Sequence, residues 1–344
     1  MKSTALVRKK ALLLEAGAIH LLNPELSTRA ERPSAGPDAG LKAFYLGFGR
    51  HRVRMTIAQN PSETPFKLKR EGDGYCVMRG ESTFLRNVTV ETPFLHSPNQ
   101  VFINLASPCI FNCKFCATPK LKIRFTLSPR KVLALIRAAM RRGGVEGIAL
   151  TSGVVDSEEK TIKLMVDAVR LIREELGHEI PIGVEPYVTK KSHIDELYSV
   201  GADEMKINVE SFDREIIKAV CPGIDYDKVL SALEYSVNVF GKNEVCSNVL
   251  IGLGESDGNV LHGLEWMAER GVVANLRPLL INPLRRRDLA EATQGRATRP
   301  SAARMLKLAL SYKSILEKHE LKTFMFKTMC HKCMGCEITP QQDV

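Results

Sequence analysis

From Val101 onward, short apolar runs alternate with long amphipathic stretches. The apolar runs are VFINLAS (101–107), GIALTS (147–152), PIGVEPY (181–187), EMKINVE (204–210), EVCSNVLIG (244–252) and ANLRPLLI (274–281). Strands that alternate with helices form a parallel sheet with right-handed crossovers. Six such units are too few to close an eight-unit barrel. The pattern therefore predicts an α/β fold, a partial (β/α)6 TIM-like barrel.

The amphipathic stretches carry the signals expected of helices. EEKTIKLMVDAVRLIREEL (158–176) is apolar at helical spacing, and SPRKVLALIRAAMRR offers Ser128 as an N-cap with Pro129 at the first helical position. In barrels of this kind the active site lies at the carboxyl ends of the strands. The residues that follow each strand are therefore the candidates for function.

The two ends of the chain differ from this pattern. The part before the barrel begins with an amphipathic helix and the loop PELSTRAERPSAGPDAG. Three segments with β-branched and alternating residues follow, at 51–59, 66–80 and 84–93, and they predict a small β-rich module. The first apolar stretch is interrupted by Glu15 and His20 and lacks a cleavage site, so we interpret it as part of the mature protein. The predicted parts are an N-terminal module (1–96), the partial barrel (97–320) and a cysteine-containing tail (321–344). No apolar run approaches the ~20 residues that span a bilayer, so a membrane location is not expected.

Six of the nine cysteines lie in two tight triplets. Thiols this close in sequence are poorly placed for disulfides with one another, whereas they suit metal ligation in a reducing compartment. This indicates a cytoplasmic protein. The other three, Cys76, Cys221 and Cys246, are expected to be small buried side chains.

The first triplet, Cys109, Cys113 and Cys116, follows the first predicted strand in NLASPCIFNCKFCATPK. Three thiolates hold three irons of a cubane cluster and leave the fourth iron open. The alternatives are a structural zinc site and unrelated core thiols. The spacing, with an aromatic residue before the third cysteine, resembles the radical S-adenosylmethionine superfamily over residues 100 to 320.

This resemblance implies a 4Fe-4S cluster whose open iron binds S-adenosylmethionine, and a 5′-deoxyadenosyl radical that abstracts hydrogen from an unactivated carbon. The cofactor carries that chemistry, and the protein positions it. The resemblance also implies cofactor contacts at successive strand ends, from Phe115, Ser152, Gly153, Glu210, Asn248, Gly252 and Glu255. Asn248 stands where a glycine is usual, so the last of these motifs matches in part. Taken singly, the glycines also fit a simple turn, and Glu210 also fits a helix N-terminus.

Other segments resemble the biotin synthase and lipoyl synthase group, notably SNVLIGLGESDGNV, NLRPLLINPLRRRDL and LTSGVVDSEE. Both enzymes insert sulfur drawn from a second cluster, but this chain lacks the cysteine sets that either uses for it. Its second triplet is instead Cys330, Cys333 and Cys336, near the C-terminus. The predicted occupant is a second, auxiliary 4Fe-4S cluster. The alternative is a zinc site with His331 as fourth ligand.

The net charge of +10 favours acidic partners. The run Arg285, Arg286 and Arg287 follows the sixth strand. These arginines are candidates to bind a substrate carboxylate or to guide an acidic carrier, or they form a solvated loop.

The resulting functional hypothesis is sulfur insertion into an octanoyl chain on an acidic carrier protein or peptide. Its partners would be a low-potential electron donor such as ferredoxin or flavodoxin and a second radical S-adenosylmethionine protein. The alternative is a radical dehydrogenase or methyltransferase. Nucleic acid is not expected, because no RNA-binding module is recognised.

Overall fold

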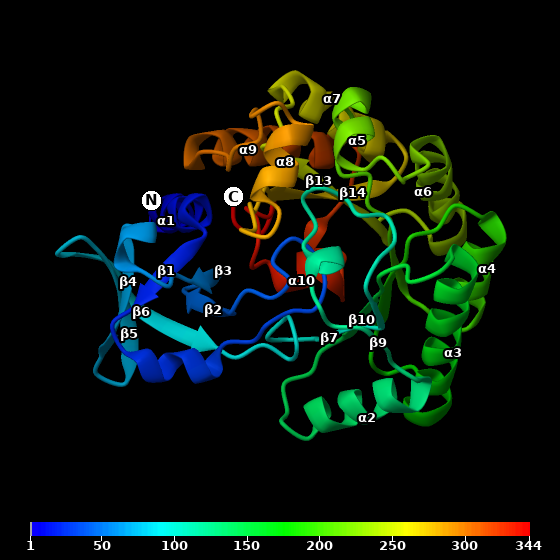
Figure 1. Ribbon diagram of the computed structural model, residues 1–344, viewed down its shortest axis with the longest axis horizontal. Coiled ribbons are helices and arrows are strands. Elements are labelled where there is room, and N and C mark those ends of the chain that lie inside the picture. The colour runs from blue at the N-terminus through cyan, green and yellow to red at the C-terminus, as the bar shows by residue number, and fades with distance from the viewer. Residues whose placement is uncertain (1) are drawn as a thin grey trace.

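The computed structural model describes residues 2–344, and its central element is the predicted parallel sheet (Figure 1). The six strands are β7 (Val101–Asn104), β10 (Ile148–Thr151), β11 (Ile182–Glu185), β12 (Glu204–Lys206), β13 (Val245–Ile251) and β14 (Val272–Pro278). Their order in the sheet is β14-β13-β12-β11-β10-β7, and every pairing is parallel. The partial barrel is confirmed, and all six strands follow the predicted chain order.

The helices follow the strands in the predicted alternation. The main helices are α2 (Pro129–Met140), α3 (Glu158–Leu176), α4 (Lys191–Ser199), α6 (Tyr226–Phe240), α7 (Asp257–Glu269) and α9 (Ala302–Lys318). The Ser128 hydroxyl accepts a hydrogen bond from the Lys131 amide, as the N-cap prediction requires. Shorter helices α5 (Arg214–Val220) and α8 (Arg286–Ala292) follow strands β12 and β14. No helix in the described chain is long and apolar enough to cross a membrane.

The N-terminal part forms a closed barrel, which is more than the β-rich module expected from the sequence. Helix α1 (Lys2–Ala16) precedes strands β1 (Ala18–Leu21), β2 (Ala43–Phe48), β3 (His51–Ile57), β4 (Phe66–Glu71), β5 (Gly74–Arg79) and β6 (Ser82–Glu91). The barrel order is β1-β3-β2-β6-β5-β4. A short helix η1 (Pro24–Arg29) and a loop join β1 to β2.

The C-terminal tail lies between the barrel and the sheet, and Figure 1 shows its helix α10 (Met329–Cys333) near the centre of the molecule. On the barrel side, the Arg54 amide donates to the Gly335 carbonyl at 2.7 Å. On the sheet side, Gln100 Nε2 donates to the Met329 carbonyl at 2.8 Å, and the Glu204 carboxylate accepts from the Thr328 amide at 2.9 Å. The tail is therefore hydrogen-bonded to both the N-terminal barrel and the parallel-sheet part of the protein. The division at residues 96 and 320 stays a prediction.

Candidate active site at the carboxyl ends of the strands

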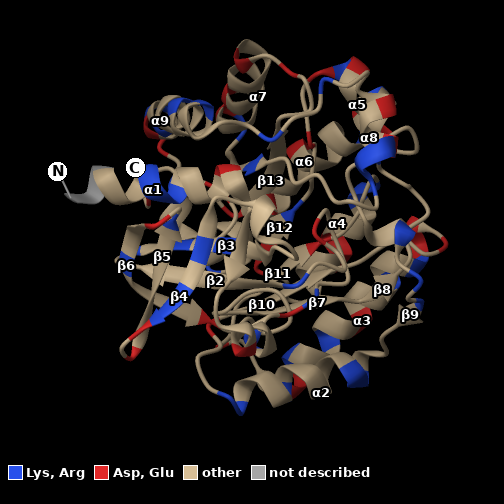
Figure 2. Ribbon diagram, turned by 60° about the vertical axis from the view of Figure 1, so that its left-hand side comes forward, with Lys and Arg blue, Asp and Glu red and all other residues tan. Residues whose placement is uncertain are grey.

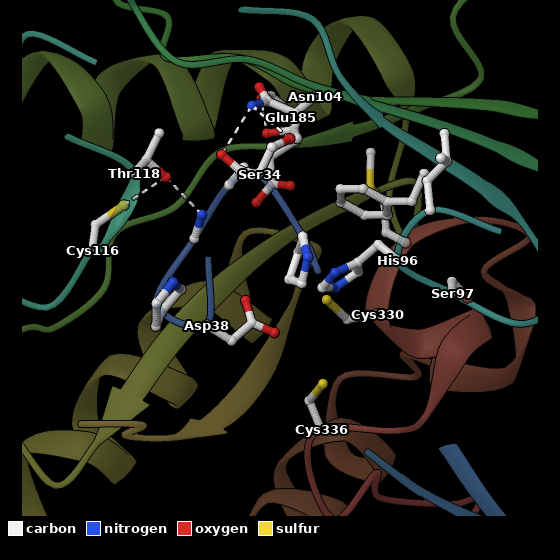
Figure 3. Close-up of a pocket in the computed structure, with 18 of the residues that line it drawn as sticks. Ser34, Asp38, His96, Ser97, Asn104, Cys116, Thr118, Glu185, Cys330 and Cys336 are labelled. Atoms are coloured by element: carbon white, nitrogen blue, oxygen red, sulfur yellow. Dashed lines mark hydrogen bonds between the residues drawn. The ribbon is translucent and has the colours of Figure 1, made fainter. Parts of the chain in front are cut away.

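A cavity of about 450 Å³ lies between the sheet, the tail and the loop before β2 (Figure 3). Thiols from both triplets line it, namely Cys109, Cys116, Cys330, Cys333 and Cys336. The fold therefore places two cysteine groups from distant parts of the chain around one space. The loop 31–38 supplies another wall, including Ser34 and Asp38, and this role was not predicted from the sequence.

The first triplet sits in a loop held on several sides. The Ile110 amide donates to the Val154 carbonyl at 2.8 Å, and the Lys114 amide donates to the Val220 carbonyl at 2.7 Å. Cys116 Sγ lies 3.3 Å from Thr118 Oγ1, and burial raises the pKa of Cys116 to about 11. A positively charged iron site offsets this penalty by binding the thiolate.

The remaining cysteine of this triplet, Cys113, lies beside a residue that the sequence did not suggest as a neighbour. Its thiol contacts Cys221, and a hydrogen bond to Cys113 together with burial raises the pKa of Cys221. Cys76, Cys221 and Cys246 are all buried, as expected. Phe115 is buried beside the triplet and lines the cavity.

The structure corrects the predicted substrate role of Arg285. The side chain is fully buried and donates to the carbonyls of Cys116 (2.6 Å) and Cys113 (2.9 Å). A third bond reaches Asn112 Oδ1 at 2.5 Å, and Asp288 pairs with the same guanidinium. Arg285 is not among the residues that line the cavity, and these bonds tie its guanidinium to the first cysteine loop and to Asp288 of α8.

The neighbouring arginines of α8 lie on the surface. Arg286 is exposed, and the Arg287 side chain is 90% exposed and pairs with Glu291 at 2.7 Å. Their contact with a substrate stays a prediction.

The predicted cofactor residues of β10 lie against the first triplet. Ser152 and Gly153 line the cavity. A Cβ atom on Gly153 would lie 2.9 Å from the Ala106 carbonyl and 3.3 Å from Cys109 Cβ. Only glycine allows this approach of the two loops without a shift.

Glu210 and Asn248 bring buried polar atoms to the cavity. Within the described chain, Glu210 Oε2 and Asn248 Oδ1 have no hydrogen-bond partner. Burial raises the pKa of Glu210 to about 8. Because unpaired buried polar atoms are rare and costly, these two fit a polar ligand such as a nucleoside.

Gly252 and Glu255 take part in a turn. The Glu255 carboxylate accepts from the Gly252 amide (2.8 Å) and the Leu253 amide (2.7 Å), and it pairs with Arg304 at 2.8 Å. A Cβ on Gly252 would lie 2.1 Å from the Thr298 carbonyl. These contacts give both residues a structural role, and direct contact with a cofactor stays a prediction for them.

Three basic side chains that were not predicted from the sequence surround the second triplet. Lys206 Nζ and Arg277 Nη1 each lie 3.3 Å from Cys330 Sγ. Arg54 is buried near Cys336 and pairs with Asp38. Lys206 and Arg277 are charged residues in strands that are otherwise apolar and buried. This break in the apolar pattern was the sequence signal that could have identified them as site residues. These charges favour thiolates and suit an anionic centre.

His331, the alternative zinc ligand, is buried among side chains other than the cysteines. Its Nε2 lies 3.1 Å from Asn275 Nδ2, and its Nδ1 lies 3.7 Å from Glu337 Oε1. In the described residues, no group of three or more His, Cys, Asp or Glu side chains converges on one ion position. The occupant of the tail triplet stays a prediction.

Comparison with known proteins decides the family of the central part. Residues 103–267 match the radical SAM superfamily. The chain carries a radical SAM domain. Lipoyl synthase from Buchnera aphidicola subsp. Schizaphis graminum is 28% identical over 173 residues, covering 50% of this chain and 53% of that protein. A probable GTP 3′,8-cyclase from Pyrococcus abyssi is 24% identical over 157 residues, covering 45% of this chain and 49% of that protein.

Among solved structures, the chain is similar to methylornithine synthase (PylB), with a TM-score of 0.45 and 18% identity. The match covers 62% of this chain and 70% of that one. The chain spans about half the length of the sequence relatives. The confirmed resemblance is to radical SAM proteins, with lipoyl synthases among the relatives.

Proposed function

We propose that this protein is a radical SAM enzyme with two 4Fe-4S clusters that inserts sulfur into an octanoyl chain on an acidic carrier protein or peptide. The observation that carries the proposal is the shared cavity. Cys109 and Cys116 of the first triplet line the same 450 Å³ space as all three cysteines of the tail. A substrate carbon in this space would be close to a radical source and to a second sulfur-containing centre.

The residues around the first triplet would hold S-adenosylmethionine. Cys109, Cys113 and Cys116 would bind the first cluster, with Ser152 and Gly153 beside it and the unpaired atoms of Glu210 and Asn248 across the cavity. When bound, the cluster and S-adenosylmethionine supply a 5′-deoxyadenosyl radical for hydrogen abstraction. The chain's own contribution is to orient this group and to exclude water.

The second triplet would hold the sulfur-donating cluster. Lys206, Arg277 and Arg54 would stabilise its negative charge. The wall near β7 and α2 is apolar and suits an acyl chain; its side chains are Leu95, Phe102, Phe125, Leu127 and Leu135. The relationship to lipoyl synthase supports the same substrate class.

The surface supports acidic partners. In Figure 2 the ribbon carries Lys or Arg positions, drawn blue, on α8 and near β9 (Phe125–Thr126). Lys122, Arg124 and Arg286 belong to these segments; they are exposed and form no ion pair with any described residue. This region would receive an acidic carrier or a ferredoxin- or flavodoxin-like electron donor. Because lipoate contains two sulfur atoms, a second radical SAM protein would complete the product.

The second candidate function gives the tail cluster a different task. In this candidate the second cluster binds substrate or relays electrons, as in a radical dehydrogenase or methyltransferase, and it is supported by a relative whose name, probable GTP 3′,8-cyclase, states no sulfur transfer. Such a cluster survives each turnover, whereas a sulfur donor is consumed.

The test uses anaerobic enzyme, dithionite, S-adenosylmethionine and an octanoyl-lysyl peptide. We expect 5′-deoxyadenosine and a thiolated octanoyl product at less than one equivalent per chain. The triple variant C330A/C333A/C336A should still form 5′-deoxyadenosine but no carbon–sulfur bond. Many turnovers with both clusters intact, or a product without new sulfur, would favour the second candidate.

A further inference from the structure

His96 is a cavity residue for which the reaction outlined above has no use. It lies in the loop between β6 and β7, and Figure 3 shows its imidazole in the cavity, directed toward Cys330. The ring packs on Phe102 with centroids 4.8 Å apart. Burial lowers the pKa of His96, and the positive charge of Arg277, whose Nη1 is 3.3 Å from Cys330 Sγ, is felt at the imidazole and lowers this pKa further.

Tyr45 ties the backbone of His96 to the tail triplet. The Tyr45 hydroxyl donates to the His96 carbonyl at 2.6 Å, and the same phenol is hydrogen-bonded to Cys333. The Tyr45 ring packs so closely on Gly335 that a Cβ there would lie 2.3 Å from Tyr45 Cε1. The loop carrying His96 is thus positioned through the residues that surround the second triplet.

The imidazole nitrogens are available for a ligand. Within the described chain, no hydrogen bond or ion pair engages them, whereas nearby carboxylates are committed: Asp38 to Arg54 and Glu185 to Lys206.

Three thiolates leave one iron of a cubane without a protein ligand. We propose that His96 supplies that ligand, binding the fourth iron of the cluster held by Cys330, Cys333 and Cys336 through an imidazole nitrogen. This inference rests on the proposed second cluster. A ligated fourth iron leaves no open iron for substrate, so this inference argues against the substrate-binding form of the second candidate function.

A histidine ligand has a measurable consequence. In iron–sulfur centres, replacing thiolate by neutral imidazole lowers the negative charge and raises the reduction potential. We therefore expect H96C, which restores a thiolate, to keep the cluster at a lower potential. H96A should lose part of its iron or take up an exogenous ligand such as imidazole.

The test uses the variant C109A/C113A/C116A, so that the tail cluster is observed alone. After anaerobic reconstitution and reduction, pulsed electron paramagnetic resonance should show nitrogen coupling from a directly bound imidazole. The coupling should change with 15N-histidine labelling and be absent in H96C. E337Q is the matched control, since Glu337 lines the same cavity and its Oε2 is a buried oxygen without a hydrogen-bond partner in the described residues, and it should keep the coupling.

The outcomes distinguish two failures. A reconstituted cluster without nitrogen coupling, or with coupling that persists in H96C, would overturn the histidine ligand while leaving the two-cluster enzyme in place. A triple variant that binds zinc or no iron at all would overturn the second cluster and the inference with it. Circular dichroism of each variant verifies that the fold is retained.

Discussion

Arg277 and Cys330 lie 53 positions apart in the chain, yet Arg277 Nη1 donates to Cys330 Sγ at 3.3 Å. Arg277 is on β14, a strand of the radical SAM domain's sheet, and Cys330 is on the tail helix. Lys206 of β12 reaches the same sulfur at the same distance. The sheet of the domain thus supplies the positive charge that the tail cysteines need.

Replacing Arg277 by glutamine should weaken the second cluster. A charged hydrogen bond to the thiolate is lost, and we expect a lower reduction potential and about half the total iron after reconstitution. Potentiometric titration and iron analysis measure both effects. R214Q is the control, because Arg214 is exposed and forms a surface ion pair with Asp227. Unchanged potential and iron in R277Q would contradict a role for this cation.

Replacing Arg285 by alanine should destabilise the first cysteine loop. The variant loses bonds to the carbonyls of Cys113 and Cys116 and leaves these groups buried. We expect the free energy of unfolding to fall by about 3–5 kcal/mol and the iron of the first cluster to be lost. Urea denaturation and cleavage of S-adenosylmethionine report these changes. R287A, at an exposed position, should keep stability within about 0.5 kcal/mol of the wild type.

Replacing Gly335 by alanine should displace the tail. The new methyl group would lie 2.3 Å from the Tyr45 ring, which has no room to move in the barrel core. Overpacking of this kind costs about 1–3 kcal/mol. Thermal unfolding measures the loss, and iron analysis should show depletion of the second cluster alone. The control is G258A, where the nearest atom is 3.8 Å away. Equal stability of the two variants would show that the contact is easily relieved.

Asp343 should make stability depend on acid pH. Burial alone would raise its pKa, but the Lys10 ammonium at 2.5 Å and a hydrogen bond from His51 lower the pKa below the ordinary 3.8. Stabilisation from a lowered pKa is complete above the ordinary value and is lost as the pH falls below it. D343N should therefore be less stable by about 3–5 kcal/mol at pH 7, and its difference from the wild type should shrink below pH 3.8.

Urea midpoints between pH 3 and pH 7 test this dependence. D156N is the comparison, since Asp156 forms an exposed pair with Lys160 and should change stability by less than about 0.5 kcal/mol. A difference between D343N and the wild type that stays constant through the acid range would exclude the titration of Asp343 as its cause.

The sequence by itself determined the features that depend on residues close together in the chain. The 158–176 helix and the Ser128 cap appear where the periodicity and capping signals place them, because both depend on neighbouring residues. The order of the six parallel strands also follows from the alternation of strands and helices. The spacing of Cys109, Cys113 and Cys116 was enough to indicate the radical SAM resemblance, because one short loop carries the whole motif.

Only the tertiary structure decided the environment of those motifs. Arg285 looked like a substrate ligand next to two exposed arginines, and only burial against Cys113 and Cys116 shows that it holds the loop. The nearness of Lys206 and His96 to the tail triplet is likewise invisible along the chain. Local sequence reports backbone preference and periodic burial, whereas the charge and solvation of a site depend on residues that the fold brings from separate elements.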